Sequence, residues 1–455
     1  MRSIMERTKL IPAVLAGLCV ALVSLGSSQA AENSGKMLRS PQVTHTAKGP
    51  TGYTVTFRYA NPNAKRVQIK GEWFFARPGD LPQMAATPDH PVIEGQGLLP
   101  KDWQPGDFPL NHPNSTGPNF PVADMTKGKD GVWTYTTPLP SGTFTYSFRV
   151  DCADGAQSQC KSISDPSNRP WNETNGVAEG SVVSNSQVFV PSDPKFNSVD
   201  YAWQGPAKTG KGKLIHETYP SPGHVTPANN NYLVVYTPPN YDPARAKPYP
   251  TLYLSHGGGE NEMGWSTQGD LANIMDNLID SGQIQPIVVV MPNAMGYANS
   301  TFDEAYDRDL IDNMIPYVEK HYHVSTSAMD RAFSGLSLGG MLTNSFIIKH
   351  PETFQYYGMM SAGLPPDNGV LTPDQIAALN GKSIWVGGGW QDVIHAAGFN
   401  TAHTGPAREV STFAKAGIPV TTNFVNGGHE WYVWRILLRD FLTRVAFLPR
   451  PYATW

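Results

Sequence analysis

The chain of 455 residues is predicted to contain two parts of different fold class, an all-β sandwich and, after it, an α/β part with a mostly parallel sheet. Residues 40–190 alternate apolar and polar side chains with a period of two between Pro-, Ser- and Gly-containing turns, which is typical of a sandwich. From residue 213 onward, near-continuous apolar segments alternate with helical ones, which indicates a parallel sheet covered on both faces. We therefore assign residues 38–190 to the sandwich, 191–212 to a linker and 213–455 to the α/β part.

Residues 1–31 have the pattern of a secretory signal peptide. Basic residues lie at the start, and an apolar run over residues 10–25 follows. This run is short for a membrane span and leads into the small residues Ala30 and Ala31, after one of which we expect cleavage. The mature chain is therefore expected to be secreted or periplasmic, with no insertion into a membrane.

After removal of that peptide the chain keeps two cysteines, Cys152 and Cys160, which are eight positions apart. Disulfides persist outside the cytoplasm, so we expect these two residues to close a local loop. A metal site is not expected, because neither a C-x-x-C pattern nor a nearby histidine accompanies them. The formal net charge of −4, without a basic tract, argues against nucleic acid as a partner.

The sandwich part contains four clear strand patterns, at residues 53–59, 66–70, 131–137 and 143–150. It resembles the immunoglobulin-like modules through Lys70-Gly-Glu-Trp, Met125-Thr-Lys and Asp130-Gly-Val-Trp. Residues 74–122 depart from that pattern with a long stretch rich in Pro, Asp, His and Trp. Loops of this length are usually functional, so we hypothesise that this stretch helps to position a substrate.

In the α/β part, strands and helices are expected to alternate. Strands are predicted at residues 231–236, 249–255, 286–291, 356–361, 383–387 and 420–425, and helices at 271–279, 303–321, 406–416 and 430–447.

Ser337 lies in a G-x-S-x-G pattern between an apolar stretch and a helical one. A sharp strand-to-helix turn that exposes a nucleophilic serine needs small residues two positions before and after it, where Gly335 and Gly339 stand. The alternative interpretation of this pattern is a glycine-rich turn without a catalytic role. The strand–turn–helix context favours a nucleophile elbow.

Where such an elbow carries a hydrolase nucleophile, the acid and then the base follow it along the chain. His429 is the histidine after Ser337 that directly follows a predicted strand, and Gly427 and Gly428 allow a sharp loop there. A surface histidine at a helix start is the alternative. Asp392 follows a strand that ends in glycines, whereas Glu352, Asp367, Asp374 and Glu409 lie in helices or connections. A helix-capping aspartate is the alternative for Asp392.

Backbone N–H groups are needed to hold the oxyanion that forms when a serine attacks an ester. We assign this role to Leu338, after the nucleophile, and to Gly258 in Ser255-His-Gly-Gly-Gly, with Gly259 as the alternative. A phosphate-binding or flexible turn is the other interpretation of these glycines. His256 precedes the serine, so we interpret it as structural.

Four segments, together with Trp265, resemble the esterase family that groups feruloyl and acetylxylan esterases (carbohydrate esterase family one), enterobactin esterases and mycolyltransferases. The segments are Leu252–Glu260, Asp309–Glu319, Arg331–Gly340 and Gly428–Arg435. The resemblance covers roughly residues 213–447 and implies an α/β-hydrolase fold. It implies Ser337 as nucleophile, Asp392 as acid and His429 as base, with Gly258 and Leu338 as oxyanion donors. The serine mechanism that follows from these residues requires no metal or organic cofactor.

Tryptophans at 265, 390, 431 and 434 fall near the predicted site loops. Aromatic walls suit a phenolic acyl group or a sugar ring, so Trp265, Trp390 and Trp431 are our candidates for substrate contact. Core packing is the alternative for each of them.

The leading hypothesis is a secreted serine carboxylic ester hydrolase that removes feruloyl or acetyl groups from plant polysaccharide, with an acyl-enzyme on Ser337. The substrate is then an esterified polysaccharide or a small aryl or acyl ester. A siderophore esterase of the enterobactin type and a sugar acyltransferase are alternatives. Outside the enzymes, the alternative is a glycan-binding protein without catalytic activity. The sequence is silent on oligomeric state.

Overall fold

The computed structural model describes residues 38–78, 98–110, 122–153, 160–168, 185–196, 199–298, 304–363, 369–392 and 405–448. The predicted signal peptide over residues 1–31 lies outside them. No helix in these described ranges is long and apolar enough to cross a membrane. Leu38–Trp455 form one compact unit, so the division into a sandwich domain, a linker and an α/β domain stays a prediction.

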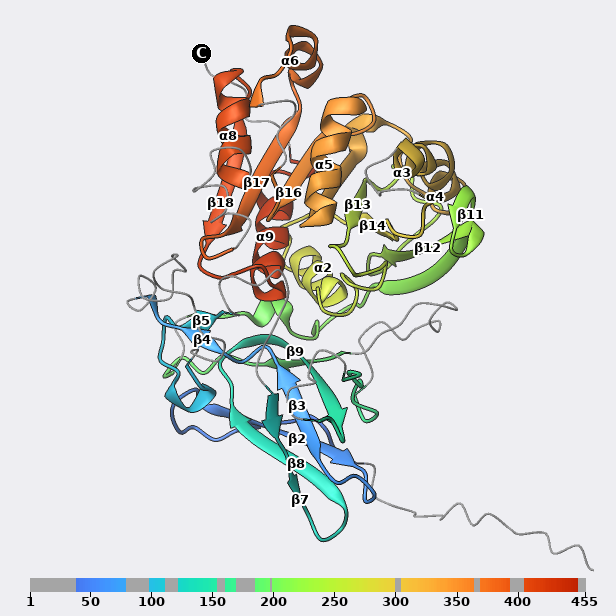
Figure 1. Ribbon diagram of the computed structural model, residues 1–455. Helices are drawn as coiled ribbons and strands as arrows, with labels where there is room; N and C mark the ends of the chain where they lie inside the picture. Colours follow the sequence, from blue (N-terminus) through green and yellow to red (C-terminus); the bar gives the residue numbers. More distant parts are fainter. Residues whose placement is uncertain are drawn as a thin grey trace, which may run out of the picture. The chain divides into compact units, whose positions relative to one another are not determined.

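The β part consists of two four-stranded antiparallel sheets (Figure 1). The first has the order β1 (Gln42–His45), β2 (Tyr53–Ala60), β8 (Val132–Pro138) and β7 (Thr126–Lys127). The second has the order β10 (Ser186–Val190), β9 (Gly142–Val150), β3 (Val67–Gly71) and β6 (Val122–Asp124). Every predicted strand of this part is present, with ends shifted by at most one residue.

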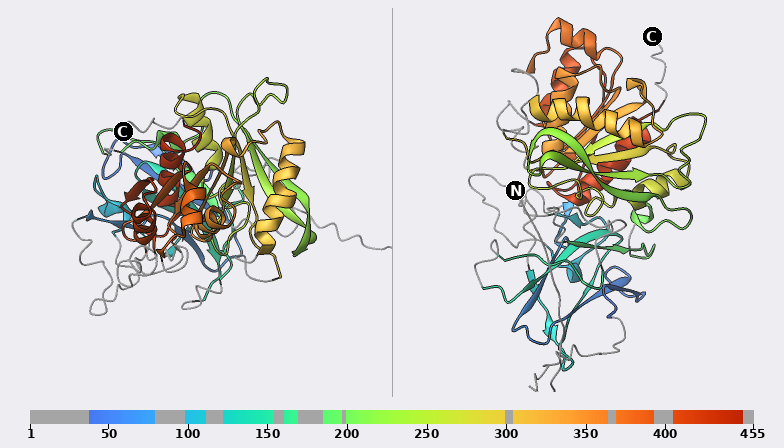
Figure 2. Two further views of the ribbon diagram at one scale, coloured as in Figure 1. Left: turned by 90° about the horizontal axis from the view of Figure 1, so that it is seen from above. Right: turned by 90° about the vertical axis from the view of Figure 1, so that its right-hand side faces the viewer.

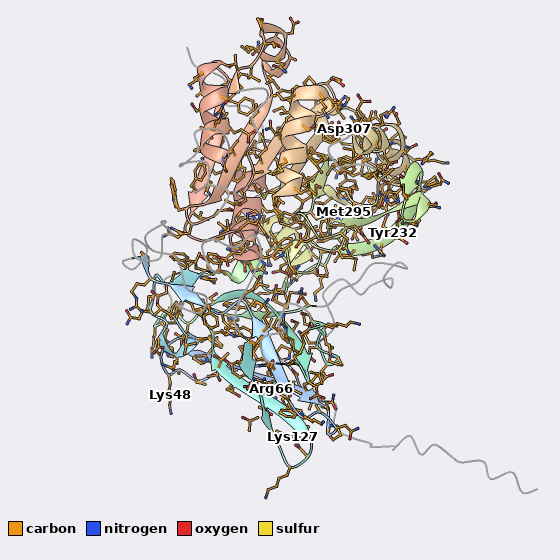
Figure 3. All side chains as sticks on the ribbon, in the orientation of Figure 1. Lys48, Arg66, Lys127, Tyr232, Met295 and Asp307 are labelled. Atoms are coloured by element: carbon orange, nitrogen blue, oxygen red, sulfur yellow. A yellow bond between two sulfur atoms is a disulfide. The ribbon has the colours of Figure 1, made fainter. Side chains whose placement is uncertain are left out.

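Apolar side chains from both sheets form one core, which makes the β part a sandwich. Phe57 of β2 packs against Tyr146 of β9, with ring centroids 4.6 Å apart, and Ile69 of β3 lies in the same cluster. Polar side chains such as Arg66 and Lys127 lie on the outside (Figure 3). Burial alternates along β2 of the first sheet, as the period of two predicts, whereas β9 of the second sheet is buried on both faces.

Two details of the β part bear on the sequence analysis. Cys152 and Cys160 form a disulfide after β9, which confirms that prediction. The long stretch over residues 74–122 contains ordered structure where it is described: β4 (Phe75–Ala76) pairs with β5 (Phe108–Pro109), and the 3-10 helix η2 (Pro100–Asp102) lies between them in sequence.

The α/β part contains an eight-stranded sheet. Its order is β11 (Lys213–Val225), β12 (Ala228–Thr237), β14 (Val288–Pro292), β13 (Thr251–Ser255), β15 (Arg331–Leu336), β16 (Tyr356–Met360), β17 (Ser383–Gly389) and β18 (Val420–Val425). The six strands from β13 to β18 are parallel, and β11 and β12 are antiparallel additions at one edge. The prediction of a mostly parallel sheet is confirmed.

Helices cover both faces of this sheet (Figures 1 and 2). One apolar cluster joins α2 (Leu271–Asp280) and α9 (Trp431–Arg444) to the sheet. The opposite cluster takes side chains from α3 (Glu304–Asp309), η5 (Leu310–Met314), α4 (Ile315–His321), α5 (Leu338–Lys349), α6 (Pro373–Leu379) and α8 (Pro406–Lys415).

One predicted helix is interrupted. The segment expected as a single helix over residues 303–321 contains the π-helical turn η5 between α3 and α4. Pro316 is the second residue of α4 and has no N–H to donate to the preceding turn, so regular α-helical bonding is broken there.

Candidate active site

Ser337 occupies a strained turn between β15 and α5. Its φ of 51° and ψ of −113° lie outside the ordinary regions for a residue with a side chain. The turn is held from below, because the Ser337 N–H donates to the Met360 carbonyl oxygen of β16 at 2.9 Å. The structure therefore gives this serine the backbone geometry that a nucleophile elbow requires.

The glycines around Ser337 are needed because backbone passes close to each of them. A Cβ on Gly335 would lie 2.6 Å from the Gly339 carbonyl carbon, and a Cβ on Gly339 would lie 2.6 Å from the Ser255 oxygen. A Cβ on Gly340 would lie 2.5 Å from the Cβ of Ala362. Helix α5 can thus approach β13 and β16 closely enough to make the sharp turn only with small residues at these positions.

His429 and Asp392 lie together on loops that leave neighbouring strands. Asp392 follows β17 and His429 follows β18, and the two strands pair in parallel. The His429 Nδ1 lies 3.1 Å and 3.0 Å from the two carboxylate oxygens of Asp392. Asp392 is fully buried and the His429 side chain is 8% exposed. A proton on Nδ1 donates to the carboxylate, which leaves Nε2 free to accept a proton.

Backbone and side-chain hydrogen bonds join these two loops. The Gln391 N–H donates to the Gly427 oxygen at 3.0 Å, and the Gly427 N–H donates to the Gln391 Oε1 at 2.7 Å. One residue earlier, the Trp390 N–H donates to the Val425 oxygen at 2.8 Å. The acid and the base are therefore placed relative to each other by contacts of the residues next to them, and Gln391 is a contributor that the sequence analysis did not identify.

All of these residues lie at the carboxyl edge of the sheet. Strands β13 and β15 pair in parallel, with β14 on the far side of β13, so the strand order reverses at this point. Such a switch point is where open α/β sheets bind ligands. A Cβ built on Gly257 would lie 3.6 Å from the Ser337 Cβ, which places the loop after β13 next to the serine.

The geometry of this loop supports Gly258 as an oxyanion donor. The Gly257 N–H is already directed to the Glu260 Oε2 at 3.2 Å. Gly258 follows it on the exposed side of the loop, with open space where a side chain would be. Leu338 is the first residue of α5, whose opening N–H groups lack acceptors within the helix and carry its positive dipole end. The roles of Gly258 and Leu338 stay proposals.

His256 holds the same loop from inside. It is buried, its Nδ1 lies 2.7 Å from the Gly257 oxygen, and its Nε2 lies 3.0 Å from the Ala294 nitrogen, whose N–H donates to it. Burial lowers the pKa of His256, so the imidazole is neutral. The position agrees with a structural role.

Two of the three tryptophans expected to contact substrate lie in the core instead. Trp265 and Trp431 are 1% and 2% exposed, and their rings pack edge to face at 5.1 Å. Their indole N–H groups donate to the Ser255 oxygen and to the Glu260 Oε1. Neither presents a free ring face to a ligand, so for these two residues the alternative of core packing holds.

Trp390 has the exposure that substrate contact needs. It is 49% exposed, lies two residues before Asp392, and packs against Phe424 at 5.1 Å. Trp434 has a different task, because its ring packs edge to face against the His429 imidazole at 5.0 Å. Trp390 therefore remains the candidate for contact, and Trp434 supports the base. No group of three or more His, Cys, Asp or Glu side chains in the described ranges could hold a metal ion.

A protein-family model described as "Putative esterase" matches residues 229–445, which contain every residue of this site. Residues 229–445 are thus similar to the members of this esterase family. The chain is 31% identical over 324 residues to an endo-1,4-beta-xylanase/feruloyl esterase from Xylanibacter ruminicola, a match that covers 68% of this chain and 39% of that protein. The chain thus spans well under half the length of this esterase relative.

Solved structures of similar proteins include a variant of the feruloyl esterase module from Clostridium thermocellum in complex with sinapinate. It is 24% identical, with a TM-score of 0.43, and the match covers 56% of this chain and 95% of that one. The enterobactin esterase from Shigella flexneri is 16% identical, with a TM-score of 0.49 and coverage of 86% and 92%.

Proposed function

We propose that this protein is a serine carboxylic ester hydrolase that removes feruloyl or acetyl groups from plant polysaccharide. The observation that carries the proposal is the strained Ser337 turn at the same sheet edge as the buried Asp392–His429 pair. Similarity to the esterase family and the name of the Xylanibacter relative support the choice of ester and of acyl group. In line with the pattern of residues 1–31, we propose that the enzyme is exported.

The reaction follows from the placement of these groups. His429 takes the Ser337 proton as the serine oxygen attacks the acyl carbon, and the N–H groups of Gly258 and Leu338 hold the oxyanion. His429 then gives the proton to the departing alcohol of the sugar. A water molecule activated by His429 attacks the acyl-enzyme, and the same oxyanion donors stabilise the second tetrahedral intermediate. Asp392 keeps the imidazole oriented throughout.

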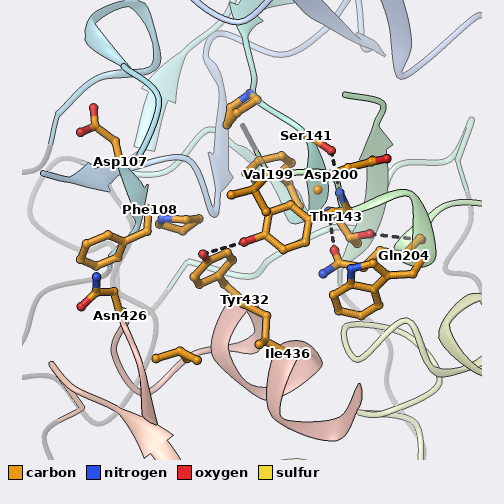
Figure 4. A pocket seen from close by; sticks show the side chains of 18 of the residues that line it. Asp107, Phe108, Ser141, Thr143, Val199, Asp200, Gln204, Asn426, Tyr432 and Ile436 are labelled. Carbon is orange, nitrogen blue, oxygen red and sulfur yellow. Dashed lines mark hydrogen bonds between the residues drawn. The ribbon is translucent and has the colours of Figure 1, made fainter. Parts of the chain in front are cut away.

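A cavity of about 410 Å³ lies beside the start of the histidine loop and is lined by none of Ser337, Asp392 and His429, so we propose it for a more distant part of the sugar chain (Figure 4). Its wall includes Asn426, three residues before His429, and Tyr432 of α9, whose hydroxyl lies 2.9 Å from that of Tyr201. Phe108 of β5, from the long stretch of the sandwich, completes the wall. Aromatic side chains with polar neighbours suit the faces and hydroxyls of sugars.

The test compares wild type with Ser337→Ala on methyl ferulate, acetylated xylan and short p-nitrophenyl esters. We expect wild type to release ferulate or acetate and Ser337→Ala to lose at least about 10⁴-fold in kcat. Ser281→Ala, at the exposed end of α2, is the matched control and should keep full activity. If both wild type and Ser337→Ala are inactive on every ester, the proposal is wrong. Transfer of the acyl group to an added sugar, in place of hydrolysis, would indicate an acyltransferase.

A further inference from the structure

Glu260 connects the loop beside the serine with the start of the helix that follows the histidine. Its Oε2 accepts the Gly257 N–H at 3.2 Å, and its Oε1 accepts the Trp431 indole N–H at 3.2 Å. Gly257 precedes the proposed oxyanion donor, and Trp431 is the first residue of α9, two positions after His429. One carboxylate therefore fixes the spacing between the two loops.

The Glu260 side chain is closely surrounded, so it has little room to move away from these two hydrogen bonds. A Cβ on Gly264 would lie 3.2 Å from its Oε2, and a Cβ on Gly257 would lie 3.6 Å from the same oxygen. Burial raises the pKa of Glu260 to about 7, although the Gly257 N–H, the Trp431 N–H and the charge of His429 act in the opposite direction. A positive charge on His429 therefore favours the ionised form of Glu260.

Gln268 extends this connection to the β-sandwich. Its Nε2 donates to the Glu260 Oε1 at 3.3 Å, and its Oε1 accepts the Asn185 side-chain N–H at 3.2 Å. Asn185 directly precedes β10 of the sandwich. A single amide side chain therefore joins the proposed active site to the β part.

Arg435 of α9 fixes Gln268 from the other side. This fully buried arginine donates through Nε to the Gln268 backbone oxygen at 2.8 Å. Its other nitrogens donate to the sandwich, to the Thr143 oxygen at 2.8 Å, the Thr145 hydroxyl at 3.2 Å and the Glu72 carboxylate at 3.3 Å. Gln268 is thus held at its backbone and at its side chain.

We propose that Glu260 is a positioning residue. It fixes the spacing between the loop after β13, which carries the proposed oxyanion donor, and the loop after β18, which carries His429. Gln268 makes this spacing depend on the β-sandwich. The inference rests on the proposed esterase function. It differs from a role of the sandwich in polymer binding, because it predicts that contacts made by the sandwich raise the turnover of a small soluble ester.

The test uses methyl ferulate, which has no sugar chain, with the full-length protein and the variants Glu260→Gln, Gln268→Ala and Asn185→Ala. Displacement of reacting groups by about 1 Å costs about 100-fold, so Glu260→Gln should lose roughly 10- to 100-fold in kcat with KM changed less than about twofold. Asn185→Ala loses one hydrogen bond of this connection and should lose roughly 3- to 10-fold in kcat, and Gln268→Ala loses two and should lose at least as much. Inhibition by an arylboronic acid, which forms a tetrahedral adduct on the serine, should weaken in parallel.

Matched controls are Glu304→Gln and Gln283→Ala, which change exposed side chains of the same types and should leave kcat unchanged. Amide hydrogen exchange over residues 256–260 provides a second readout that needs no activity. It should accelerate in Glu260→Gln and in Gln268→Ala.

An active wild type with unchanged kcat in Glu260→Gln would overturn the inference. Changes confined to KM in the Gln268 and Asn185 variants would overturn the link to the sandwich. If wild type hydrolyses no ester, the proposed function fails, and the exchange rates alone then decide whether Glu260 positions the loop; unchanged exchange would overturn that as well.

Discussion

The serine side and the histidine side of the sheet edge share close backbone packing and differ in the side-chain hydrogen bonds that are added to it. On the serine side, between β13 and β15, backbone lies directly against backbone, and a Cβ at Gly335 or Gly339 would come within 2.6 Å of it. On the histidine side, between β17 and β18, backbone is packed as closely, because a Cβ on Gly389 would clash with the Gly427 oxygen, and side-chain hydrogen bonds such as that from the Gly427 N–H to the Gln391 Oε1 are added to it. Close packing tolerates no added atom, whereas a hydrogen bond can be lost at modest cost.

This difference has a chemical reason. A serine nucleophile and its oxyanion donors work only in a narrow geometry, which rigid backbone provides. The imidazole of His429 must serve first the serine and then water, so its surroundings control orientation and charge more than exact position. We therefore expect steric changes at the closely packed glycines to damage either side, and changes in side-chain hydrogen bonding to damage the histidine side in proportion to the charge involved.

The largest effect is expected from Asp392→Asn on the histidine side. An amide in this buried position can donate to Nδ1 and so favour the wrong tautomer of His429, which should lower kcat roughly 10⁴-fold. Steady-state hydrolysis of methyl ferulate measures it, with Asp374→Asn on the exposed face of α6 as the control. A loss of less than about 10-fold would mean that another carboxylate serves as the acid.

Gly339→Ala should have the next largest effect. The new Cβ would lie 2.6 Å from the Ser255 oxygen, so α5 must shift and carry Ser337 with it. We expect roughly a 100-fold loss in kcat and about 1–3 kcal/mol in the free energy of unfolding. Gly388→Ala in β17 is the matched control, because its Cβ would meet no atom closer than 3.7 Å. Equal behaviour of the two variants would refute the steric cause of the loss.

A smaller effect is expected from Gln391→Ala. The variant removes the acceptor of the Gly427 N–H but keeps the backbone bond between the same two residues. One hydrogen bond of about 1 kcal/mol corresponds to roughly a 3- to 10-fold loss in kcat. Steady-state kinetics on methyl ferulate measure this loss in kcat, with Gln283→Ala, at an exposed position, as the control. A loss as large as that of Asp392→Asn would show that the histidine side is as intolerant as the serine side.

Glu409→Gln should change stability and leave kcat nearly unchanged. Glu409 of α8 is fully buried near Asn344 of α5, and burial raises its pKa to about 8 from the ordinary 4.5. The folded chain keeps a proton that the unfolded chain releases, so stability falls as pH rises from about 4.5 to about 8. The neutral glutamine removes this loss, so its gain in melting temperature should be greater at pH 8 than at pH 5. An equal gain at both pH values would contradict the raised pKa.

The parts of the site that sequence alone predicted depend on local pattern and chain order. Ser337 lies in a motif whose glycines have a steric cause, and His429 and Asp392 each follow a strand of the parallel sheet. The tryptophans could not be assigned in this way, because Trp265 and Trp431 lie close to the site in sequence but their burial depends on how α9 packs on the sheet. Glu260 had one signal, its place directly after the three glycines.

Other features depend on contacts between distant residues. The links of Gln268 to Asn185 and to Arg435 span 83 and 167 positions, and no local pattern marks them. Strand β11 was missed because Pro220, Pro222 and Gly223 normally interrupt strands. It lies at the sheet edge and shifts register after Pro220, which is where proline is tolerated.

The buried guanidinium of Arg435 also limits how such a protein can be recombined during evolution. Its charge is matched by Glu72, which belongs to the other part of the chain and is 5% exposed. If this α/β part were fused to an unrelated front module, the arginine would lose that partner, and breaking a buried ion pair costs about 3–5 kcal/mol. A successful exchange would need a second substitution at Arg435. The two parts are therefore expected to be inherited as a pair.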